Sequence, residues 1–168
     1  MNIVLIGFMG SGKSAIGHEL AKELDMNYLD TDELIEKAEK ISINDIFAKK
    51  GEPYFRDLET GVIKTLGDYD NFVISTGGGM VLREENVKML REIGPLVLLW
   101  ANPEAVYARV KSETHRPLLN VPDPRAEIKK ILDSRTPIYN RVADHKVDTS
   151  KLDVDECVKG IMEWLKSR

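Results

Sequence analysis

The chain has 168 residues, of which 42% are hydrophobic and 31% charged, and its net charge is −4. This length suits one domain with a sizeable core, and the composition is that of a globular protein rather than a disordered one. The net negative charge argues against a general nucleic-acid or membrane-surface binder, although local arginines can still bind a small anionic substrate. The single cysteine, Cys157, excludes an internal disulfide and a cysteine-based zinc site, and its spacing predicts a buried helix position. No signal peptide opens the chain and no apolar run could span a bilayer, so we expect a cytoplasmic protein.

The first strong signal is the glycine-rich stretch Gly7–Ser14, which reads GFMGSGKS. It follows an apolar run over 3–6 and precedes a helical pattern over 15–24, which is the context of a phosphate-binding loop of the type G-x-x-x-x-G-K-[ST]. Backbone amides and the helix start form an anion cradle, Lys13 can reach the β- and γ-phosphates, and the Ser14 hydroxyl can ligate Mg²⁺. The alternative is a glycine-rich turn that binds nothing. The lysine and serine in register behind a strand favour binding of a nucleoside triphosphate.

Apolar runs alternate with helical patterns along the rest of the chain. The predicted strands cover residues 2–6, 27–29, 72–75, 96–100 and 146–148. Helical patterns cover residues up to about 25, then 33–50, 54–66, 83–93, 103–111, 125–139 and 154–165. Strands that alternate with helices predict a parallel sheet with helices on both faces. Ligands in such sheets bind at the carboxyl ends of the strands, where three of the motifs fall.

Asp30 and Asp32 follow the second predicted strand. Most phosphate-loop enzymes place a metal-binding aspartate at the end of a buried strand, but the strand over 72–75 ends in Thr76. We therefore expect the two aspartates to supply that role, on one side of an extended segment and about 7 Å apart. One could face Mg²⁺ through water, and the other could accept hydrogen bonds from an acceptor hydroxyl and its proton. The alternative for one of them is an N-cap of the helix that starts near Glu33.

Arg56 and Glu59 stand three residues apart in a predicted helix. They could form a surface ion pair worth under about 1 kcal/mol. Arg56 could instead grip a substrate carboxylate while Glu59 holds it in place, and the spacing alone favours neither. Further along, Gly77–Gly79 follows a buried strand and predicts close approach of the backbone to a ligand. The alternative is a tight strand-to-helix turn, which needs fewer glycines.

Three arginines form the last group: Arg109, Arg116 and Arg135. Arg116 lies in a polar, proline-rich segment over 114–124 that is longer than a simple connection, which predicts a lid. An arginine that swings from a lid onto the phosphates would stabilise transition-state charge and exclude water. The alternative is a solvated loop arginine.

Together the motifs strongly resemble those of the shikimate kinase family. The matching stretches, in the family's order and across nearly the whole chain, are GFMGSGKS, DTDELIE, EPYFRDLE, STGGGMVL, RPLL and SRTPIYNRVADHKVDT. The resemblance implies a P-loop NTPase fold like that of nucleoside monophosphate kinases, with a five-stranded parallel sheet and a lid. It divides one kinase domain into a core (1–29, 67–110 and 125–168), a substrate-binding region (30–66) and a lid (111–124). The implied reaction is ATP-dependent phosphorylation of the 3-hydroxyl of shikimate, on the route to chorismate and the aromatic amino acids.

The resemblance also implies roles for individual residues. ATP would be bound by Gly10, Ser11, Gly12, Lys13, Ser14, Ala15, Arg109 and Arg116, with Arg109 beside the adenine. Shikimate would be bound by Asp32, Arg56, Gly78, Gly79 and Arg135. Of these, Arg56 and Arg135 would hold the carboxylate of shikimate. Lys13, Asp32 and Arg116 would be catalytic, and Asp30 would help Ser14 to hold Mg²⁺, through water. The family's adenine contact after the last strand has no assignable counterpart in 149–153.

Other functions remain as alternatives. A gluconate kinase has a similar size and fold, and a nucleotide kinase would carry similar lid arginines. A nucleotide-dependent switch is disfavoured because the chain has no guanine-selecting N-K-x-D motif. For partners, we expect shikimate and ATP only, with a monomeric protein that binds neither nucleic acid nor membranes.

Overall fold

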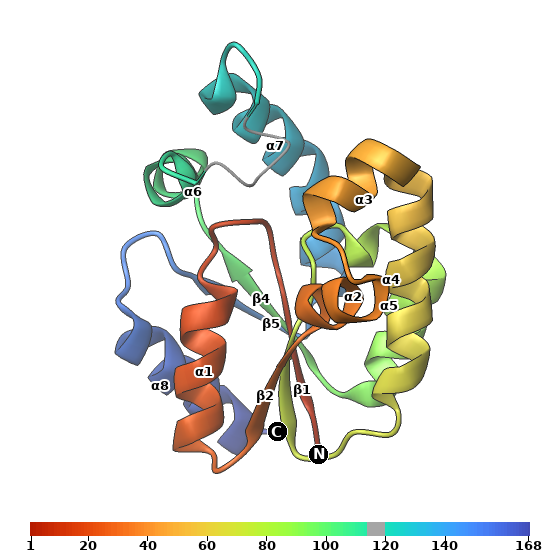
Figure 1. Cartoon of the computed structure of the whole chain (residues 1–168). Coiled ribbons are helices and arrows are strands. Elements are labelled where there is room, and N and C mark those ends of the chain that lie inside the picture. The colour runs from red at the N-terminus through yellow and green to blue at the C-terminus, as the bar shows by residue number, and fades with distance from the viewer. Residues whose placement is uncertain (114–119) are drawn as a thin grey trace.

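The computed structural model describes residues 1–113 and 120–168, and it contains a five-stranded parallel sheet (Figure 1). The strands are β1 (Ile3–Ile6), β2 (Asn27–Asp30), β3 (Phe72–Ser75), β4 (Leu96–Trp100) and β5 (His145–Asp148). Their order in the sheet is β2-β3-β1-β4-β5, and every neighbouring pair is parallel. The predicted strands and the predicted parallel sheet are confirmed.

Helices connect the strands and cover both faces of the sheet (Figure 1). They are α1 (Lys13–Glu23), α2 (Thr31–Glu39), α3 (Ile43–Lys50), α4 (Glu52–Leu66), α5 (Glu84–Ile93), α6 (Pro103–Val110), α7 (Pro124–Val142) and α8 (Val154–Lys166), with a short 3₁₀ helix, η1 (Met80–Leu82). None of the helices in the described residues is both long and apolar enough to cross a membrane.

The sheet separates two hydrophobic cores, and the side chains of β1 point alternately into one and the other. Ile3 and Leu5 pack in the core that α1 and α8 cover, which also holds the buried Cys157. Val4 and Ile6 face the other side of the sheet, where α4, α5, α6 and α7 supply the packing residues. Because β1 is completely buried on both faces, it reads as a continuous apolar run in the sequence.

One predicted helix is wrong. The helical pattern over 33–50 is two helices, because α2 ends at Glu39 and its C-cap residue, Lys40, has a φ of 59° in the left-handed region. Ser42 then caps α3 by accepting a hydrogen bond from the Asp45 amide. The break lets α3 turn and pack against α4, where Ile46 and Phe55 form a third, small core.

The carboxyl ends of the three strands β1, β2 and β3 lie side by side in the sheet. One of the motifs lies at the end of each strand: Gly7–Ser14 after β1, Asp30 and Asp32 at the end of β2, and Gly77–Gly79 just beyond β3. The topology therefore gathers three distant stretches of sequence at one edge, as expected for ligand sites in parallel sheets.

Candidate active site

The phosphate loop leads from β1 into α1 without a side-chain cap. Gly12 is the N-cap residue of α1, with a φ of 98°, and it has no side chain to satisfy the first amides of the helix. A residue with a Cβ would be strained in this left-handed conformation. The helix therefore begins with backbone N–H groups available to an anion, and its dipole adds positive potential there.

A cavity of about 330 Å³ opens beside this loop. It is lined by Met9, Gly10, Gly12, Lys13, Ser14, Ala15, Asp30, Asp32, Ser75, Thr76, Gly77, Gly78, Arg109 and Glu113. Most of the predicted nucleotide-binding residues and both aspartates thus border one space, while Ser11 is completely buried within the loop. The Lys13 ammonium donates hydrogen bonds to the carbonyl oxygens of Gly7 (2.7 Å) and Phe8 (2.9 Å), which keeps its charge at the loop.

Asp30 and Asp32 are arranged differently from the extended pair that we expected. Asp30 is the N-cap of α2, because its Oδ1 accepts a hydrogen bond of 2.8 Å from the Asp32 amide. The helix begins at Thr31, so Asp32 lies in the first helical turn rather than on a strand. The expectation of an extended segment is wrong, whereas the alternative that one aspartate caps the helix is confirmed. Both side chains still line the same cavity.

The three-glycine turn Gly77–Gly79 is the centre of the site. A Cβ on Gly77 would lie 2.9 Å from Oδ1 of Asp32 and 2.9 Å from Oε1 of Glu59. A Cβ on Gly79 would lie 2.2 Å from Nη1 of Arg56. The glycines leave room for the side chains of α2 and α4, which come into contact with the turn itself, while the close approach of a ligand stays a prediction.

Gly78 faces the remaining components. A Cβ there would lie 3.5 Å from Nη1 of Arg135 and 3.5 Å from the Gly7 carbonyl oxygen of the phosphate loop. Arg56 and Arg135 therefore lie next to consecutive residues of one turn, and that turn touches the phosphate loop. Residues from α2, α4 and α7 converge with Lys13 at this edge of the sheet.

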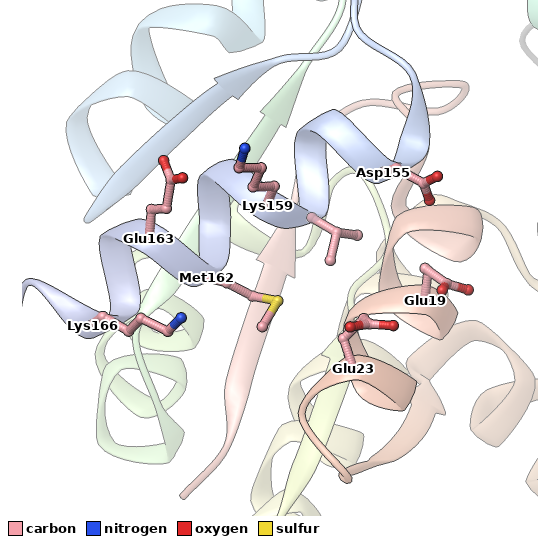
Figure 2. A pocket seen from close by; sticks show the side chains of 8 residues that line it. Glu19, Glu23, Asp155, Lys159, Met162, Glu163 and Lys166 are labelled. Carbon is pink, nitrogen blue, oxygen red and sulfur yellow. The ribbon is translucent and has the colours of Figure 1, made fainter.

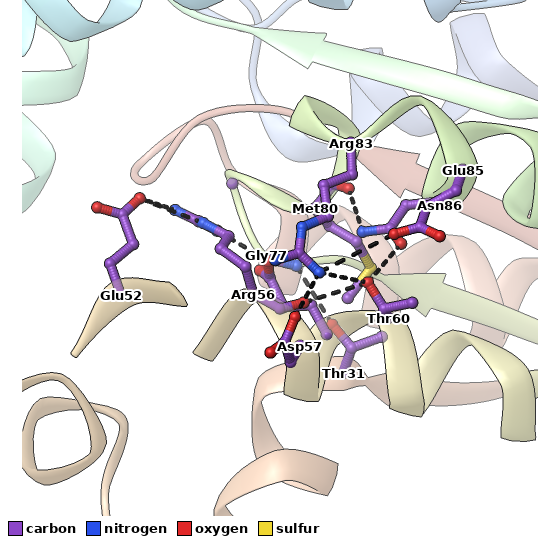
Figure 3. A network of polar contacts seen from close by, with 12 residues as sticks. Thr31, Glu52, Arg56, Asp57, Thr60, Gly77, Met80, Arg83, Glu85 and Asn86 are labelled. Carbon is purple, nitrogen blue, oxygen red and sulfur yellow. Dashed lines mark hydrogen bonds and ion pairs between the residues drawn. The ribbon is translucent and has the colours of Figure 1, made fainter. Parts of the chain in front are cut away.

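Arg56 is held between two glutamates on its own helix, Glu52, which Figure 3 labels, and Glu59. Its Nη1 donates to Glu59 Oε2 at 2.8 Å, and its Nη2 donates to Glu52 Oε1 at 3.1 Å. The Arg56 side chain is only 13% exposed and that of Glu59 is completely buried, so their ion pair is not a surface pair. Glu59 holds Arg56 as the second alternative requires, and the grip on a substrate carboxylate stays a prediction. Burial raises the pKa of Glu59, and the Arg56 charge opposes this shift.

Arg135 and Tyr139 are one helical turn apart on α7. The Arg135 guanidinium lies 5.6 Å from the centre of the Phe8 ring, over the phosphate loop. Tyr139 is completely buried, and its hydroxyl donates to the Gly78 carbonyl oxygen. Burial raises the pKa of Tyr139 to about 12, so the hydroxyl stays protonated and remains a donor. Sequence reasoning did not identify Tyr139 as a site residue, because nothing in the sequence shows that the Gly78 carbonyl oxygen lies opposite its hydroxyl.

Arg109 contacts the phosphate loop from α6. Its guanidinium donates to the carbonyl oxygens of Gly10 (2.9 Å) and Thr149 (2.6 Å) and to the Thr149 hydroxyl (3.1 Å). The buried Thr149 hydroxyl in turn donates to the Ser11 carbonyl oxygen at 2.8 Å. Thr149 was not predicted as a site residue, although the resemblance pointed to its segment. Arg116 lies outside the described residues, and its role stays a prediction.

The ligand set fits a weakly held hard cation rather than a closed metal site. Among residues 1–113 and 120–168, no group of three or more His, Cys, Asp or Glu side chains could hold a metal ion. Ser14 and Asp30 nevertheless line the same cavity at the phosphate loop. Mg²⁺ in kinases keeps several waters and takes few protein ligands beside the phosphate oxygens, so these two side chains fit that ion.

A second cavity, of about 450 Å³, lies between α1 and α8 (Figure 2). It is lined by Glu19, Glu23, Asp155, Val158, Lys159, Met162, Glu163 and Lys166. None of the predicted site residues borders it. It is larger than the cavity at the phosphate loop, but the phosphate loop, the two aspartates and Arg109 line the smaller one.

Comparison with known proteins agrees with this site. The family model for shikimate kinase matches residues 9–166. A shikimate kinase from Pelotomaculum thermopropionicum is 47% identical over 165 residues, which are 98% of this chain and 95% of that protein. A crystal structure of shikimate kinase from Aquifex aeolicus is 42% identical, with a TM-score of 0.85 over 99% of this chain and 97% of that one.

A further structure bears on the substrate. Shikimate kinase from Acinetobacter baumannii, in complex with shikimate, is 34% identical with a TM-score of 0.94, and the match covers 99% of this chain and 93% of that chain. These likenesses extend over the whole chain, and they confirm the P-loop fold of the nucleoside-monophosphate-kinase type. The chain belongs to the shikimate kinase family.

Proposed function

We propose that this protein transfers the γ-phosphoryl group of ATP to the 3-hydroxyl of shikimate, giving ADP and shikimate 3-phosphate for the synthesis of chorismate and the aromatic amino acids. The observation that carries the proposal is the contact of Gly77–Gly79 with Asp32, Arg56, Arg135 and the phosphate loop. It is supported by family membership and by the related structure that was solved with shikimate.

The nucleotide half of the reaction rests on the phosphate loop. The first amides of α1 and the Lys13 ammonium would bind the β- and γ-phosphates, with Lys13 exchanging its present carbonyl partners for phosphate oxygens. Gly10, Ser11, Gly12 and Ala15 form the rest of the cradle. Arg109 lies over its outer end and would flank the adenine. Arg116 would add positive charge at the transferring group.

The acceptor half rests on the residues around the glycine turn. Arg56 and Arg135 would hold the carboxylate of shikimate, because guanidinium groups bind carboxylates through paired, charge-assisted hydrogen bonds. Gly78 and Gly79 would let the ring hydroxyls approach the backbone. Asp32 would accept a hydrogen bond from the 3-hydroxyl, and so orient one oxygen lone pair toward the γ-phosphorus.

In the transfer, a bond forms between the 3-oxygen and the γ-phosphorus while the bond from that phosphorus to the leaving ADP oxygen breaks. The hydroxyl proton leaves to Asp32 or, through it, to solvent. Mg²⁺, held by Ser14 and through water by Asp30, would neutralise charge on the phosphates. Since phosphoryl transfer proceeds through a loose transition state, positioning and charge contribute more than proton abstraction.

The test is ADP release from ATP in the presence of shikimate, measured beside a matched reaction with gluconate. We expect shikimate to accelerate ADP formation and gluconate to have no effect. Turnover of gluconate without turnover of shikimate would overturn the proposed substrate. Acceleration by shikimate in the purified protein, with no protein partner present, would exclude a nucleotide-dependent switch.

We further propose that the protein acts as a cytoplasmic monomer and binds neither nucleic acid nor membranes. The net charge of −4 argues against binding of nucleic acid and membranes, and the scarcity of large exposed apolar side chains among the described residues favours a monomer.

Chelation of Mg²⁺ is expected to abolish turnover, and added Mg²⁺ should restore the turnover.

A further inference from the structure

A buried polar bridge joins α5 to the glycine turn and to α4 (Figure 3). At its centre is Asn86, which is 1% exposed. Its Nδ2 donates to the Met80 carbonyl oxygen at 2.9 Å, and its Oδ1 accepts from the Thr60 hydroxyl at 2.8 Å. Neither Asn86 nor Thr60 lines the cavity at the phosphate loop, so neither contacts the reacting groups from that cavity.

Both ends of the bridge stand next to residues that would bind shikimate. Met80 follows Gly79 directly, and its amide donates to the Gly77 carbonyl oxygen at 3.1 Å. With Asn86 bound to the Met80 carbonyl oxygen, hydrogen bonds fix the peptide groups on both sides of Met80. Asn86 therefore ties the glycine turn to α5.

The other end of the bridge lies one helical turn beyond Arg56. The Thr60 hydroxyl lies 3.2 Å from the Arg56 carbonyl oxygen and 2.8 Å from Asn86 Oδ1. Because a hydroxyl has one proton to donate, the shorter bond to Asn86 takes it. From outside, Arg83 donates to the Thr60 hydroxyl at 3.2 Å and to Asp57 at 2.8 Å. The bridge thus ties the turn that contains Gly79 to the segment of α4 that carries Arg56.

We infer that Asn86 and Thr60 are positioning residues for the acceptor, and that they set the distance between the glycine turn and the Arg56 guanidinium. The inference rests on the proposed function. The tolerance at this contact is small, because a Cβ on Gly79 would already overlap the guanidinium. If the glycine turn or α4 shifts, the distance changes between the Arg56 guanidinium, which would bind the carboxylate, and the backbone of the turn, which would bind the ring hydroxyls.

The chain offers a matched control at the opposite end of the sheet. Asn2 is also buried, donates to the Tyr69 carbonyl oxygen at 2.8 Å and accepts from the Phe72 amide at 3.0 Å. Asn2→Ala therefore removes one donated and one accepted hydrogen bond, as Asn86→Ala does, although the partners of Asn2 are only partly buried. It leaves the glycine turn and Arg56 untouched.

The experiment compares the steady-state kinetics of the unmutated protein with those of Asn86→Ala, Thr60→Val, Thr60→Ser and Asn2→Ala, well below each melting temperature. We expect Asn86→Ala and Thr60→Val to raise the KM for shikimate about tenfold, since each leaves buried polar groups unpaired that must move to regain partners. The KM for ATP should stay within about twofold, because the phosphate loop makes no bond to the bridge. Thr60→Ser, which keeps the hydroxyl, should restore the parental KM for shikimate.

The outcomes separate this inference from the proposed function. An unchanged KM for shikimate in Thr60→Val, or an equal rise in Asn2→Ala, would overturn the positioning role while leaving the enzyme a shikimate kinase. Should Asn86→Ala fail to fold, the Thr60→Val and Thr60→Ser pair alone decides. Absence of shikimate turnover in the unmutated protein would overturn both.

Discussion

The Arg56 side chain serves stability and binding at once, because its guanidinium pairs with the completely buried Glu59 and also lies against Gly79. Removing one partner of a buried pair leaves the other charge uncompensated, which costs more than the pair itself contributes. The two consequences can be measured separately.

For stability, Arg56→Ala should lower the free energy of unfolding at neutral pH by roughly 3 kcal/mol. The pKa of Glu59, already raised by burial, would rise further without the arginine. The penalty should be absent below the ordinary glutamate pKa of about 4.3 and grow as the pH rises toward the folded-state pKa. Urea unfolding of Arg56→Ala at several pH values tests this, with Arg56→Ala/Glu59→Gln as the control that should recover part of the loss at neutral pH.

For binding, Arg56→Ala should lower kcat/KM for shikimate by a factor of about ten to a thousand, as expected from loss of charge-assisted hydrogen bonds. ATP affinity should change little, because Arg56 does not border the phosphate loop. Steady-state kinetics with each substrate varied in turn would show the difference. A large loss of ATP affinity would place Arg56 in a different role.

Asp32 offers a second test of a single side chain. Asp32→Asn keeps the shape but removes the charge and the ability to take a proton, so kcat should fall by about a hundredfold. The melting temperature should change little, since the Asp30 carboxylate, not Asp32, caps α2. Unchanged turnover would remove Asp32 from the chemistry.

Among the connecting elements, the glycine turn leaves little room for a larger residue. Gly79→Ala should lower kcat/KM for shikimate at least about tenfold, because the new Cβ would meet the Arg56 guanidinium and displace it. Gly61 in the middle of α4 has no atom within 4 Å of its added Cβ, and it is the matched control. Gly61→Ala should leave the kinetics unchanged and stabilise the protein by about 0.5–1 kcal/mol through helix propensity.

The segment after β5 should affect the nucleotide rather than the acceptor. Thr149→Val keeps the volume but removes the hydroxyl that links Arg109 to the Ser11 carbonyl oxygen. We expect the KM for ATP to rise about fivefold to tenfold, because the phosphate loop loses a buried hydrogen bond, and the KM for shikimate to stay near its parental value. A rise confined to shikimate would contradict this assignment.

At the scale of the whole molecule, the parallel sheet and the helices on its two faces follow from patterns that are visible in the sequence, whereas the pairing of β2 with β3 rather than with β1 does not. Continuous apolar runs such as Leu96–Trp100 and the caps of the helices, for example Asn102, identify the elements. Their alternation then leaves few topologies. The motifs at the strand ends indicated the place of the cavity, because the carboxyl ends of parallel strands lie at one edge of the sheet.

Tertiary contacts that spacing does not encode could not be predicted. The start of α2 at Thr31 depends on the Asp30 cap, which competes with the extended alternation that we expected. Tyr139 and Asn86 occupy buried positions that look like ordinary core positions in the sequence, and their polar roles depend on which carbonyl oxygen lies opposite. Such partners become visible only when the backbone of the glycine turn is placed.

The described surface also predicts the oligomeric state. The large hydrophobic side chains exposed in residues 1–113 and 120–168 are Met1, Leu82 and Leu152, which are scattered along the chain. An obligate dimer buries a continuous apolar patch, so we expect a monomer. Light scattering after size exclusion should give a mass near 19.0 kDa, and a mass of twice that value at micromolar concentration would contradict the expectation.

The division of the sheet into two cores has an evolutionary consequence. The helix that starts from the phosphate loop, α1, is anchored with α8 on one face, whereas α4, α5 and α7 rest on the other. Mutations in α4 and α5 can change the second core without touching the contacts between α1 and α8, provided that Phe8 of the phosphate loop, which packs in the second core, keeps its place. Specificity for the acceptor could therefore change during evolution while the nucleotide-binding part stays the same. Exchange of α4 and α5 between related proteins would test this in the laboratory.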